Sequence, residues 1–373
     1  MIDTIALTIP KEKATMLDLS YHGVPSWDLQ GRTNAYDKFV KNPSSKDLKG
    51  DMYFPRLTAY TRKGRDNQKH TLIKIEFSAP KLLYQNNLDE LSDKQFSDVV
   101  YALNDRLDRM GVHIERKILA EADVSSVHYS KNFELKNGYT AQYVISELNK
   151  INLNKRLDLG RARFINDGQS LIAHATTHEI VFYDKIADLN KGSKRSMDRD
   201  QTPYQASLFE KLNDRREILR FEVRLTKKQK MNSVFKELGL NESPTFIEVF
   251  SSEKSKKVLW HYWNKLVEKN SLMLFAHSLT AKDLLKQILI ARRSVKGKTA
   301  IYLVGLLLLA REGNGLRELR SILSKRNKDR TWYRICADAT ETTEQLNKVR
   351  VREWFDGIKN DLQTYKPFHI DDS

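Results

Sequence analysis

Two short segments of the chain carry side chains that could act together on a phosphate ester. In residues 178–185, the two-residue period of a strand places Tyr183 and Lys185 on one face. In residues 219–225, the same period gathers three charged residues on one face: Arg220, Glu222 and Arg224. A tyrosine can attack phosphorus and keep the phosphate as a covalent ester, while nearby cations stabilise the charge that develops. These residue types therefore suit transesterification of a phosphodiester.

Both segments also have a simpler interpretation. A tyrosine at a strand end is commonly a packing residue whose hydroxyl reaches water, and periodicity alone favours that role for Tyr183. Arginine and glutamate pairs across strands commonly face solvent and contribute little to stability. The catalytic interpretation therefore depends on the rest of the sequence.

A divalent cation would assist such a reaction by stabilising negative charge, and carboxylate oxygens are the ligands that Mg²⁺ and Mn²⁺ prefer. Asp123 and Glu222 are the acids best placed on expected strands, and Glu121 and His128 are further candidates. A lone histidine is more often structural than a metal ligand. We expect Mg²⁺ or Mn²⁺ as cofactor, held mainly by the acids.

Other reaction classes lack motif support. The sequence contains no P-loop, GxGxxG, HExxH, GxSxG or paired CxxC motif, which disfavours nucleotide hydrolysis, dehydrogenase chemistry and zinc proteolysis. The 373 residues include 64 Lys and Arg against 48 Asp and Glu, a net charge of +16 spread along the chain. This balance indicates a polyanionic partner, either nucleic acid or a membrane surface.

The compartment is indicated by three features. The single cysteine, Cys336, excludes an internal disulfide and fits a reducing environment. Residues 1–10 start an alternating strand and do not resemble a signal peptide. The most apolar run, residues 300–310, has about half the roughly 20 residues that span a bilayer. We expect a cytoplasmic protein that has no membrane partner.

The coarse pattern predicts an α+β fold with a mainly antiparallel sheet. Segments with strand-like alternation are residues 2–9, 53–61, 71–77, 114–129, 161–165, 170–185 and 219–225. The hairpin between residues 53 and 77 has a cationic tip, and Asp167-Gly168 marks a second hairpin. Amphipathic helices are expected at residues 92–110 and 141–149.

Strand signals largely stop after residue 227, and helical period takes over. We therefore predict a catalytic domain over residues 1–243 and an all-α domain over residues 244–373. Residues 299–340 have spacing compatible with a helix-turn-helix, although small three-helix units are common for other reasons. The basic aromatic residues near one expected helix start are candidate contacts to DNA: Arg330, Trp332, Tyr333 and Arg334.

Seven blocks of the sequence carry a resemblance to a known family. In chain order they are MIDTIALTIP, IEFSAPKLLYQNN, EADVSSVHYSKN, IVFYDK, LRFEVRL, GKTAIYL and RTWYR. Each block is weak alone, but their order and spacing from residue 1 to about residue 340 resemble the replication initiation endonucleases of filamentous bacteriophages, the gene II protein family.

The resemblance implies a fold and an activity. Members of the family nick one strand of duplex circular DNA at the origin, stay attached to the 5′ phosphate through a tyrosine, and later close the displaced strand. The implied fold is an HUH-nickase-like catalytic domain, and the implied partners are origin DNA, first double-stranded and then single-stranded, with host helicase and polymerase as further candidates. The implied setting is rolling-circle replication inside a bacterial host cell, and assembly into an oligomer on DNA stays open.

By position, the family's nucleophile falls on Tyr183, with Lys185 as electrostatic support. The family's aspartate falls on Asp123, and its Arg-Phe-Glu block includes Glu222. Three further basic residues are candidate contacts to DNA or to the acids: Lys131, Arg220 and Arg224.

Three departures from the family pattern stand out. Glu121 replaces an arginine, Gln85 replaces the usual glycine, and no His-hydrophobic-His pair of the larger HUH superfamily is present. Two other functions stay open: a plasmid-type initiator or relaxase of the same chemistry, and a non-catalytic origin-binding repressor. Tyr129 or Tyr204 would compete as nucleophile if either lay beside Tyr183.

Overall fold

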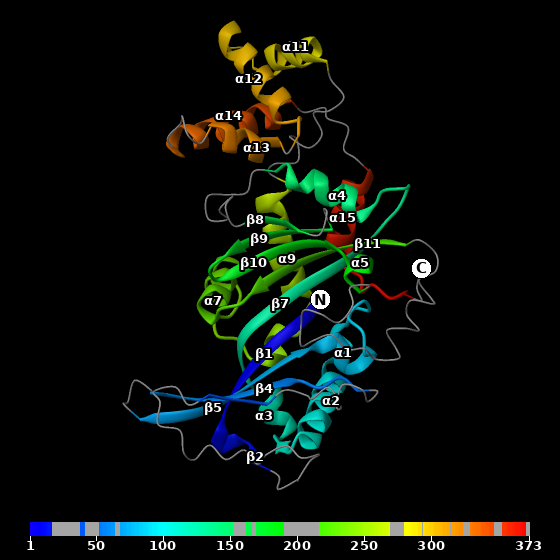
Figure 1. The fold of residues 1–373 in the computed structure, drawn as a ribbon, viewed down its shortest axis with the longest axis vertical. Coiled ribbons are helices and arrows are strands. Elements are labelled where there is room, and N and C mark those ends of the chain that lie inside the picture. The colour runs from blue at the N-terminus through cyan, green and yellow to red at the C-terminus, as the bar shows by residue number, and fades with distance from the viewer. Residues whose placement is uncertain are drawn as a thin grey trace.

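A single antiparallel sheet forms the centre of the molecule (Figure 1). The computed structural model describes residues 1–16, 38–41, 52–63, 68–151, 162–165, 169–189, 216–268, 280–292, 294–313, 315–323, 329–346 and 353–370. Nine of the described strands join in the order β3-β4-β5-β1-β7-β11-β10-β9-β8, and every neighbouring pair is antiparallel. The predicted α+β class with a mainly antiparallel sheet is therefore confirmed.

The strand bounds follow the alternating segments of the sequence. The sheet strands are β1 (Ile2–Pro10), β3 (Lys38–Lys41), β4 (Arg56–Lys63), β5 (Lys69–Ser78), β7 (Asp123–Leu135), β8 (Ala162–Ile165), β9 (Ser170–Ala175), β10 (His178–Asp184) and β11 (Glu217–Leu225). Two short strands, β2 (Thr15–Met16) and β6 (Val112–His113), pair separately. The predicted Asp167-Gly168 turn lies outside the described residues, but β8 and β9 on either side of it do pair.

The two faces of the sheet differ in chemistry because successive strand residues point to opposite sides. One face is apolar and fully buried, with Ile5, Phe77 and Phe221 among its residues. Helices pack on this face, and their apolar stripes complete the main hydrophobic core. The other face, called the polar face below, carries Arg220, Glu222 and their cross-strand neighbours.

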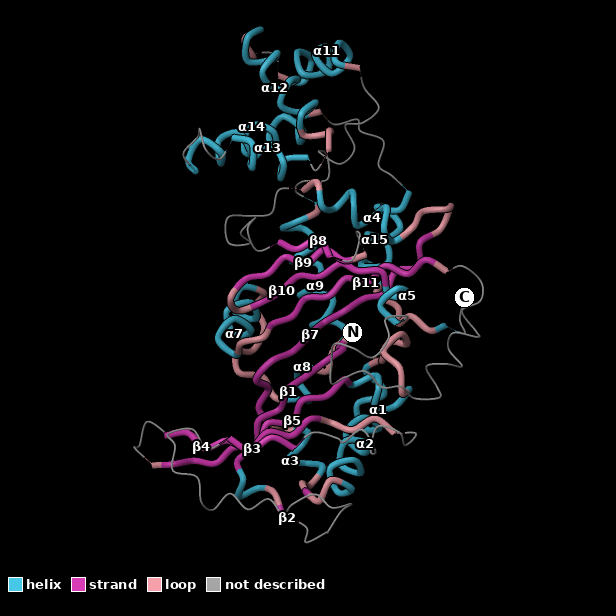
Figure 2. Tube along the Cα trace, in the orientation of Figure 1, coloured by secondary structure: helices cyan, strands magenta, loops and turns pink. Residues whose placement is uncertain are grey.

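The helices of the main body are mostly amphipathic. They are α1 (Ala79–Tyr84), α2 (Phe96–Arg109), α3 (Arg116–Ala120), α4 (Ala141–Asn149), α5 (Lys185–Leu189), α7 (Lys228–Glu237), α8 (Phe246–Val249), α9 (Ser252–Leu266) and α15 (Glu353–Thr364), with 3₁₀ turns at Lys11–Lys13 and Asp93–Gln95. The predicted helix over residues 141–149 has these bounds in the structure. Figure 2 shows these helices around a continuous band of strands.

The predicted strand over residues 114–129 is wrong in its first half. Residues 116–120 form α3, since the segment RKILA consists mainly of strong helix formers and buries only Leu119. Glu121 is the C-terminal cap of this helix, and β7 begins at Asp123. Glu121 therefore does not share a strand face with Asp123.

A separate helical unit contains α11 (Ala281–Ala291), α12 (Gly297–Leu309), α13 (Gly315–Leu323) and α14 (Asp329–Gln345). It has its own hydrophobic cluster, which includes Leu303 and Trp332, and it lies beyond the β8 edge of the sheet (Figure 1). None of the helices that the structure describes has the length and apolarity needed to cross a membrane.

The hydrophobic core does not divide at residue 243, where we placed the domain boundary. Helices α8 and α9 pack into the main core, and α15 returns to it after the helical unit. The rings of Trp263 on α9 and Phe355 on α15 lie 5.5 Å apart, centroid to centroid. The second core is therefore an insertion between α9 and α15, and helical period alone could not distinguish it from the helices of the main body.

Candidate active site

Tyr183 lies on the polar face near the end of β10. The strand register places it directly opposite Arg220 of β11 and Ser170 of β9. Its side chain is 9% exposed. Burial raises the pKa of the Tyr183 phenol well above its usual value, and the Arg220 guanidinium partly opposes this shift. The phenol is therefore protonated near neutral pH, with a fixed cation beside it.

Lys185, the first residue of α5, is fully buried beside this tyrosine. Its Nζ donates a hydrogen bond to Asn87 Oδ1 over 2.8 Å and lies 5.7 Å from the centre of the Tyr183 ring. Burial lowers the pKa of the Lys185 ammonium to about 8, and the charge of Arg220 contributes to this shift. Lys185 can therefore change protonation state close to neutral pH.

Arg220 is held by three groups from distant parts of the chain. Its Nη2 lies 2.7 Å from Asp3 Oδ1 and donates to Ser130 Oγ at 2.7 Å, and its Nη1 donates to the Asn87 carbonyl oxygen. Asp3 reaches this position because the pairing of β1 with β7 shifts by one residue between Ile2 and Thr4, a β-bulge. The guanidinium is thereby locked beside Tyr183.

Asp3, Asn87 and Ser130 were not among the residues predicted for the site. Each lies in one of the sequence blocks that resemble the phage initiation endonucleases, and membership in these blocks is the sequence feature that could have indicated them. Their polar side chains gave no reason to expect contact, since they come from β1, the loop after α1, and β7. Only the strand order brings them to one guanidinium.

The loop that carries Asn87 is fixed by its own hydrogen bonds. Asn86 Oδ1 accepts from the backbone N–H groups of Leu88 and Asp89. Glu90 accepts from the Lys131 ammonium at 2.7 Å and from the backbone N–H of Phe368 at 3.0 Å. A small apolar cluster on the polar face covers this end of the sheet; its members are Leu88, Leu189, Ile218 and Ile370.

Glu222 forms a second charged group one step along the same face. Its Oε2 lies 3.0 Å from Arg224 Nη2, and its Oε1 lies 3.5 Å from His128 Nδ1. Burial acts to raise the pKa of the Glu222 carboxyl, but Arg224 and His128 outweigh it and hold the pKa well below its usual value. Glu222 is therefore an ionised carboxylate.

The four predicted metal ligands do not come together. Only His128 and Glu222 lie side by side. Asp123 is at the far end of β7, roughly 20 Å from Glu222 by strand register, and pairs with Lys228. Across the residues that the structure describes, no group of three or more His, Cys, Asp or Glu side chains could hold a metal ion. The predicted set of ligands is thus not assembled.

The predicted DNA contacts separate into buried and exposed residues. Lys131 is 3% exposed and lies on the opposite face of β7, where its ammonium pairs with Glu90, so it cannot reach a DNA phosphate. Trp332 is buried in the core of the helical unit. Arg330 and Arg334 are exposed, and Tyr333 is half-buried. Arg224 is half-buried on the polar face.

The competing tyrosines are not beside Tyr183 where the structure describes them. Tyr129 is buried on the apolar face of β7, and its hydroxyl donates to the Val249 carbonyl oxygen at 3.2 Å. Tyr204 lies outside the described residues. Among the described tyrosines, Tyr183 is the one that the strand register places directly opposite Arg220.

Comparisons of the chain with known proteins found no significant match. No protein-family model matches the chain, and neither the curated proteins nor the solved structures include a significant match. The function is therefore inferred from the residues of the site. It consists of a phenol, a fixed guanidinium and an amine with a near-neutral pKa at one end of a polar sheet face. This combination can stabilise negative charge on a phosphoryl group and move a proton.

Proposed function

We propose that the protein is a DNA nicking and joining endonuclease that starts rolling-circle replication through a covalent 5′-phosphotyrosine at Tyr183. The observation that carries the proposal is the buried cluster in which Tyr183 lies opposite Arg220 and beside Lys185. The resemblance to filamentous phage initiation endonucleases and the net charge of +16 agree with this function. The substrate is origin DNA, and host helicase and polymerase are the further partners it requires.

The reaction needs no external energy source. The Tyr183 oxygen forms a bond to phosphorus, and the bond from phosphorus to the 3′ oxygen breaks. The phenol gives up one proton and the departing 3′ oxygen takes one up, which leaves a 3′ hydroxyl and a tyrosine-linked 5′ phosphate. Reversal of the same steps joins a strand, because the phosphotyrosine ester retains the bond energy.

The neighbours of Tyr183 have distinct roles in this proposal. The Arg220 guanidinium stabilises the phenolate and the phosphoryl oxygens as charge develops. Lys185, with a pKa of about 8, exchanges a proton at the reacting oxygens. Mg²⁺ or Mn²⁺ stays a prediction that inhibition by EDTA tests, with His128 and Glu222 as the two predicted ligands that lie together.

The burial of Tyr183 favours a second candidate. A phenol that is 9% exposed, with a raised pKa, is also what a packing tyrosine would show. The alternative is an origin-binding protein without nicking activity, such as a repressor. It predicts tight, salt-sensitive DNA binding, no need for a metal and no strand cleavage.

The test is a cleavage assay on supercoiled plasmid that carries the cognate origin, with Mg²⁺, followed on denaturing gels. Wild type should nick the plasmid and leave protein on the 5′ end. Tyr183→Phe should bind the same DNA and leave it intact, because no phenol remains to attack. Tyr129→Phe is the matched control, since it removes a buried phenol from the opposite face and should still nick.

The outcomes separate the candidates. Wild type that binds without nicking supports the non-catalytic protein. Nicking by Tyr183→Phe would mean that another group attacks phosphorus, and residues such as Tyr204 would then be tested. A plasmid-type initiator or relaxase gives the same gel with a different cognate origin.

A further inference from the structure

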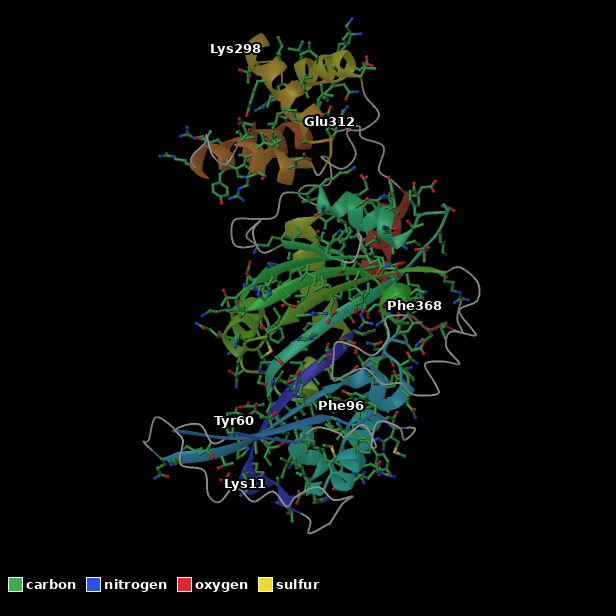
Figure 3. The ribbon with its side chains drawn as sticks, in the orientation of Figure 1. Lys11, Tyr60, Phe96, Lys298, Glu312 and Phe368 are labelled. Atoms are coloured by element: carbon green, nitrogen blue, oxygen red, sulfur yellow. The ribbon has the colours of Figure 1, made fainter. Side chains whose placement is uncertain are left out.

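The β4–β5 hairpin extends past the sheet that supports it. Strand β1 pairs with β5 only as far as Leu72, and β3 pairs with β4 only between Leu57 and Tyr60. Beyond these points, residues 61–63 pair with residues 69–71 alone, without another described strand on either side. We call these six residues the cationic ribbon. In Figure 1 it projects from the lower corner of the sheet, and Figure 3 labels Tyr60 near its base.

The charge of the ribbon opposes its own pairing. The register places Lys63 opposite Lys69, which are two like charges, and Arg62 opposite His70. Like charges directly opposite in an antiparallel pair are destabilising. Lys69 and His70 are exposed, and none of the six residues is acidic. Such a ribbon would gain stability from a partner that supplies negative charge between its strands and around them.

The chemistry of the ribbon selects duplex DNA among polyanions. The six residues are threonine, arginine, lysine and histidine, without an aliphatic or large aromatic side chain. Single-stranded DNA is usually held by aromatic stacking platforms, and membrane-surface segments insert Trp, Phe or Leu. A two-stranded antiparallel ribbon fits the major groove of B-DNA, where lysine and arginine reach phosphates and base edges.

We propose that the cationic ribbon inserts into the major groove of duplex DNA and holds the duplex while Tyr183 acts on one strand. The statement that Tyr183 acts on the bound duplex rests on the proposed nicking function. The statement that the ribbon binds duplex DNA rests on the geometry and charge of the hairpin, and it can be tested without any cleavage.

The position of the ribbon sets how much DNA the protein covers. By register, Lys69 and Tyr183 are separated by about 14 residue steps along the strands and four strand spacings across them. That is roughly 50 Å in a flat sheet, and twist shortens it. At about 3.4 Å per base pair, the ribbon contacts the duplex roughly 12 to 15 base pairs from the nick.

The test compares two double variants of the full-length protein. Lys63→Gln/Lys69→Gln removes two charges from the ribbon. Lys236→Gln/Lys257→Gln removes two from exposed positions on α7 and α9, which pack on the apolar face of the sheet. Each is made in the Tyr183→Phe background, and binding to a duplex origin fragment is measured between 50 and 200 mM salt, values chosen to span a roughly fourfold range.

We expect the ribbon variant to bind duplex about tenfold more weakly and to lose about one unit of salt slope per lysine. The control should bind like the parent protein, and both should keep the parent's thermal midpoint. Hydroxyl-radical footprints of the Tyr183→Phe parent should reach at least about one helical turn from the position that wild type nicks, and this outer protection should disappear in the ribbon variant.

Two results would overturn the inference. Equal losses in both variants would mean that only total charge matters. Unchanged duplex binding with new self-association of the ribbon variant would mean that the lysines merely keep an edge strand from pairing with other chains. If the ribbon dependence appears but wild type never nicks, the proposed nicking function fails and the binding half of the inference stands.

Discussion

Lys185 exchanges water for one hydrogen bond to Asn87 and a 3.7 Å approach to Asp188, and its pKa falls to about 8 as a result. A buried ammonium of this kind costs stability, because these two contacts replace its hydration only in part. The same burial gives the protein an amine that can donate or accept a proton near neutral pH. Stability and chemistry therefore make opposite demands on this residue.

Replacing Lys185 with methionine should change how the free energy of unfolding depends on pH. Between about pH 8 and pH 10.5 the unfolded chain keeps its lysine protonated while the folded wild type does not, so wild-type stability rises with pH there. Lys185→Met lacks this dependence. Any stability advantage of Lys185→Met over wild type should therefore be largest below pH 8 and shrink by on the order of 2 kcal/mol toward pH 10.5.

The measurement is urea unfolding of both proteins at several pH values, with single-turnover nicking at pH 7.5. Nicking by Lys185→Met should be at least about tenfold slower, because general acid–base groups typically contribute 10²-fold or more. A pH-independent stability difference would show that Lys185 titrates normally in the folded protein.

Gln85 offers a second prediction at a single residue. It caps α1 with a φ of 56°, in the left-handed region that favours glycine, and its Oε1 is buried without a hydrogen-bond partner. Gln85→Gly removes both penalties and should raise the free energy of unfolding by about 1 kcal/mol.

Asn137 supplies the control for this prediction. It also has a positive φ, 59°, but asparagine tolerates that region, and its Nδ2 donates to Glu353 at 2.7 Å. Asn137→Gly should therefore bring no gain in thermal unfolding experiments. Equal gains in both variants would argue that loop flexibility, rather than relief of strain, sets the effect.

At the scale of elements, the bulge in β1 positions the site. It turns Asp3 onto the polar face, where the carboxylate meets Arg220, and so couples the first strand to β11 and β10. Asp3 is a positioning residue in this arrangement, since it acts on the chemistry through the guanidinium. Without it, the buried Arg220 keeps only its neutral partners, Ser130 and the Asn87 carbonyl oxygen.

Asp3→Ala should lower the free energy of unfolding by about 3 kcal/mol, because it leaves a buried cation without its counter-ion. Asp123→Ala is the matched comparison: its carboxylate is well exposed, and loss of the 3.3 Å pair with Lys228 should cost less than about 1 kcal/mol. Chemical denaturation of the two variants gives both values. Similar losses would mean that Arg220 relaxes toward water when Asp3 is removed.

At the scale of the whole molecule, the helical unit is inserted into the main body rather than attached to its end. The chain leaves the main core after α9, forms α11 to α14 with their own cluster, and returns as α15. Near the start of α13, an added Cβ on Gly315 would come within 2.8 Å of Lys150 atoms, so the unit approaches the end of α4 closely. Figure 1 shows the unit at the edge of the sheet opposite the β4–β5 hairpin.

This organisation predicts the outcome of two deletions. Replacing residues 280–346 with a short flexible linker should leave a folded protein, because the main core keeps α8, α9 and α15. Truncation after residue 243 removes those helices and exposes apolar residues such as Phe77 and Phe221, which pack on Phe246 and Trp263, so it should not fold. Circular dichroism and thermal melting distinguish the two, and cooperative unfolding of the truncated chain would refute the shared core.

Much of this arrangement follows from the sequence alone. Two-residue alternation predicted most of the sheet strands and placed Tyr183 on the same side of its strand as Glu179 and Val181, while helical period predicted α2 and α4. These features depend on side chains that are close along the chain, so they can be inferred without knowing any distant contact. The excess of positive charge and the cationic hairpin are likewise properties of the sequence.

Only the tertiary structure determines which of these residues lie in contact. The order of the strands brings Arg220 to Tyr183 and Asp3, separates Asp123 from Glu222, and buries Lys131 against Glu90. The same is true of the return of α15 to the main core. Each depends on contacts between residues many tens of positions apart, which local periodicity does not encode because the chain can pair its strands in many orders. Burial, and with it the pKa of Lys185 and Tyr183, follows only once that order is set.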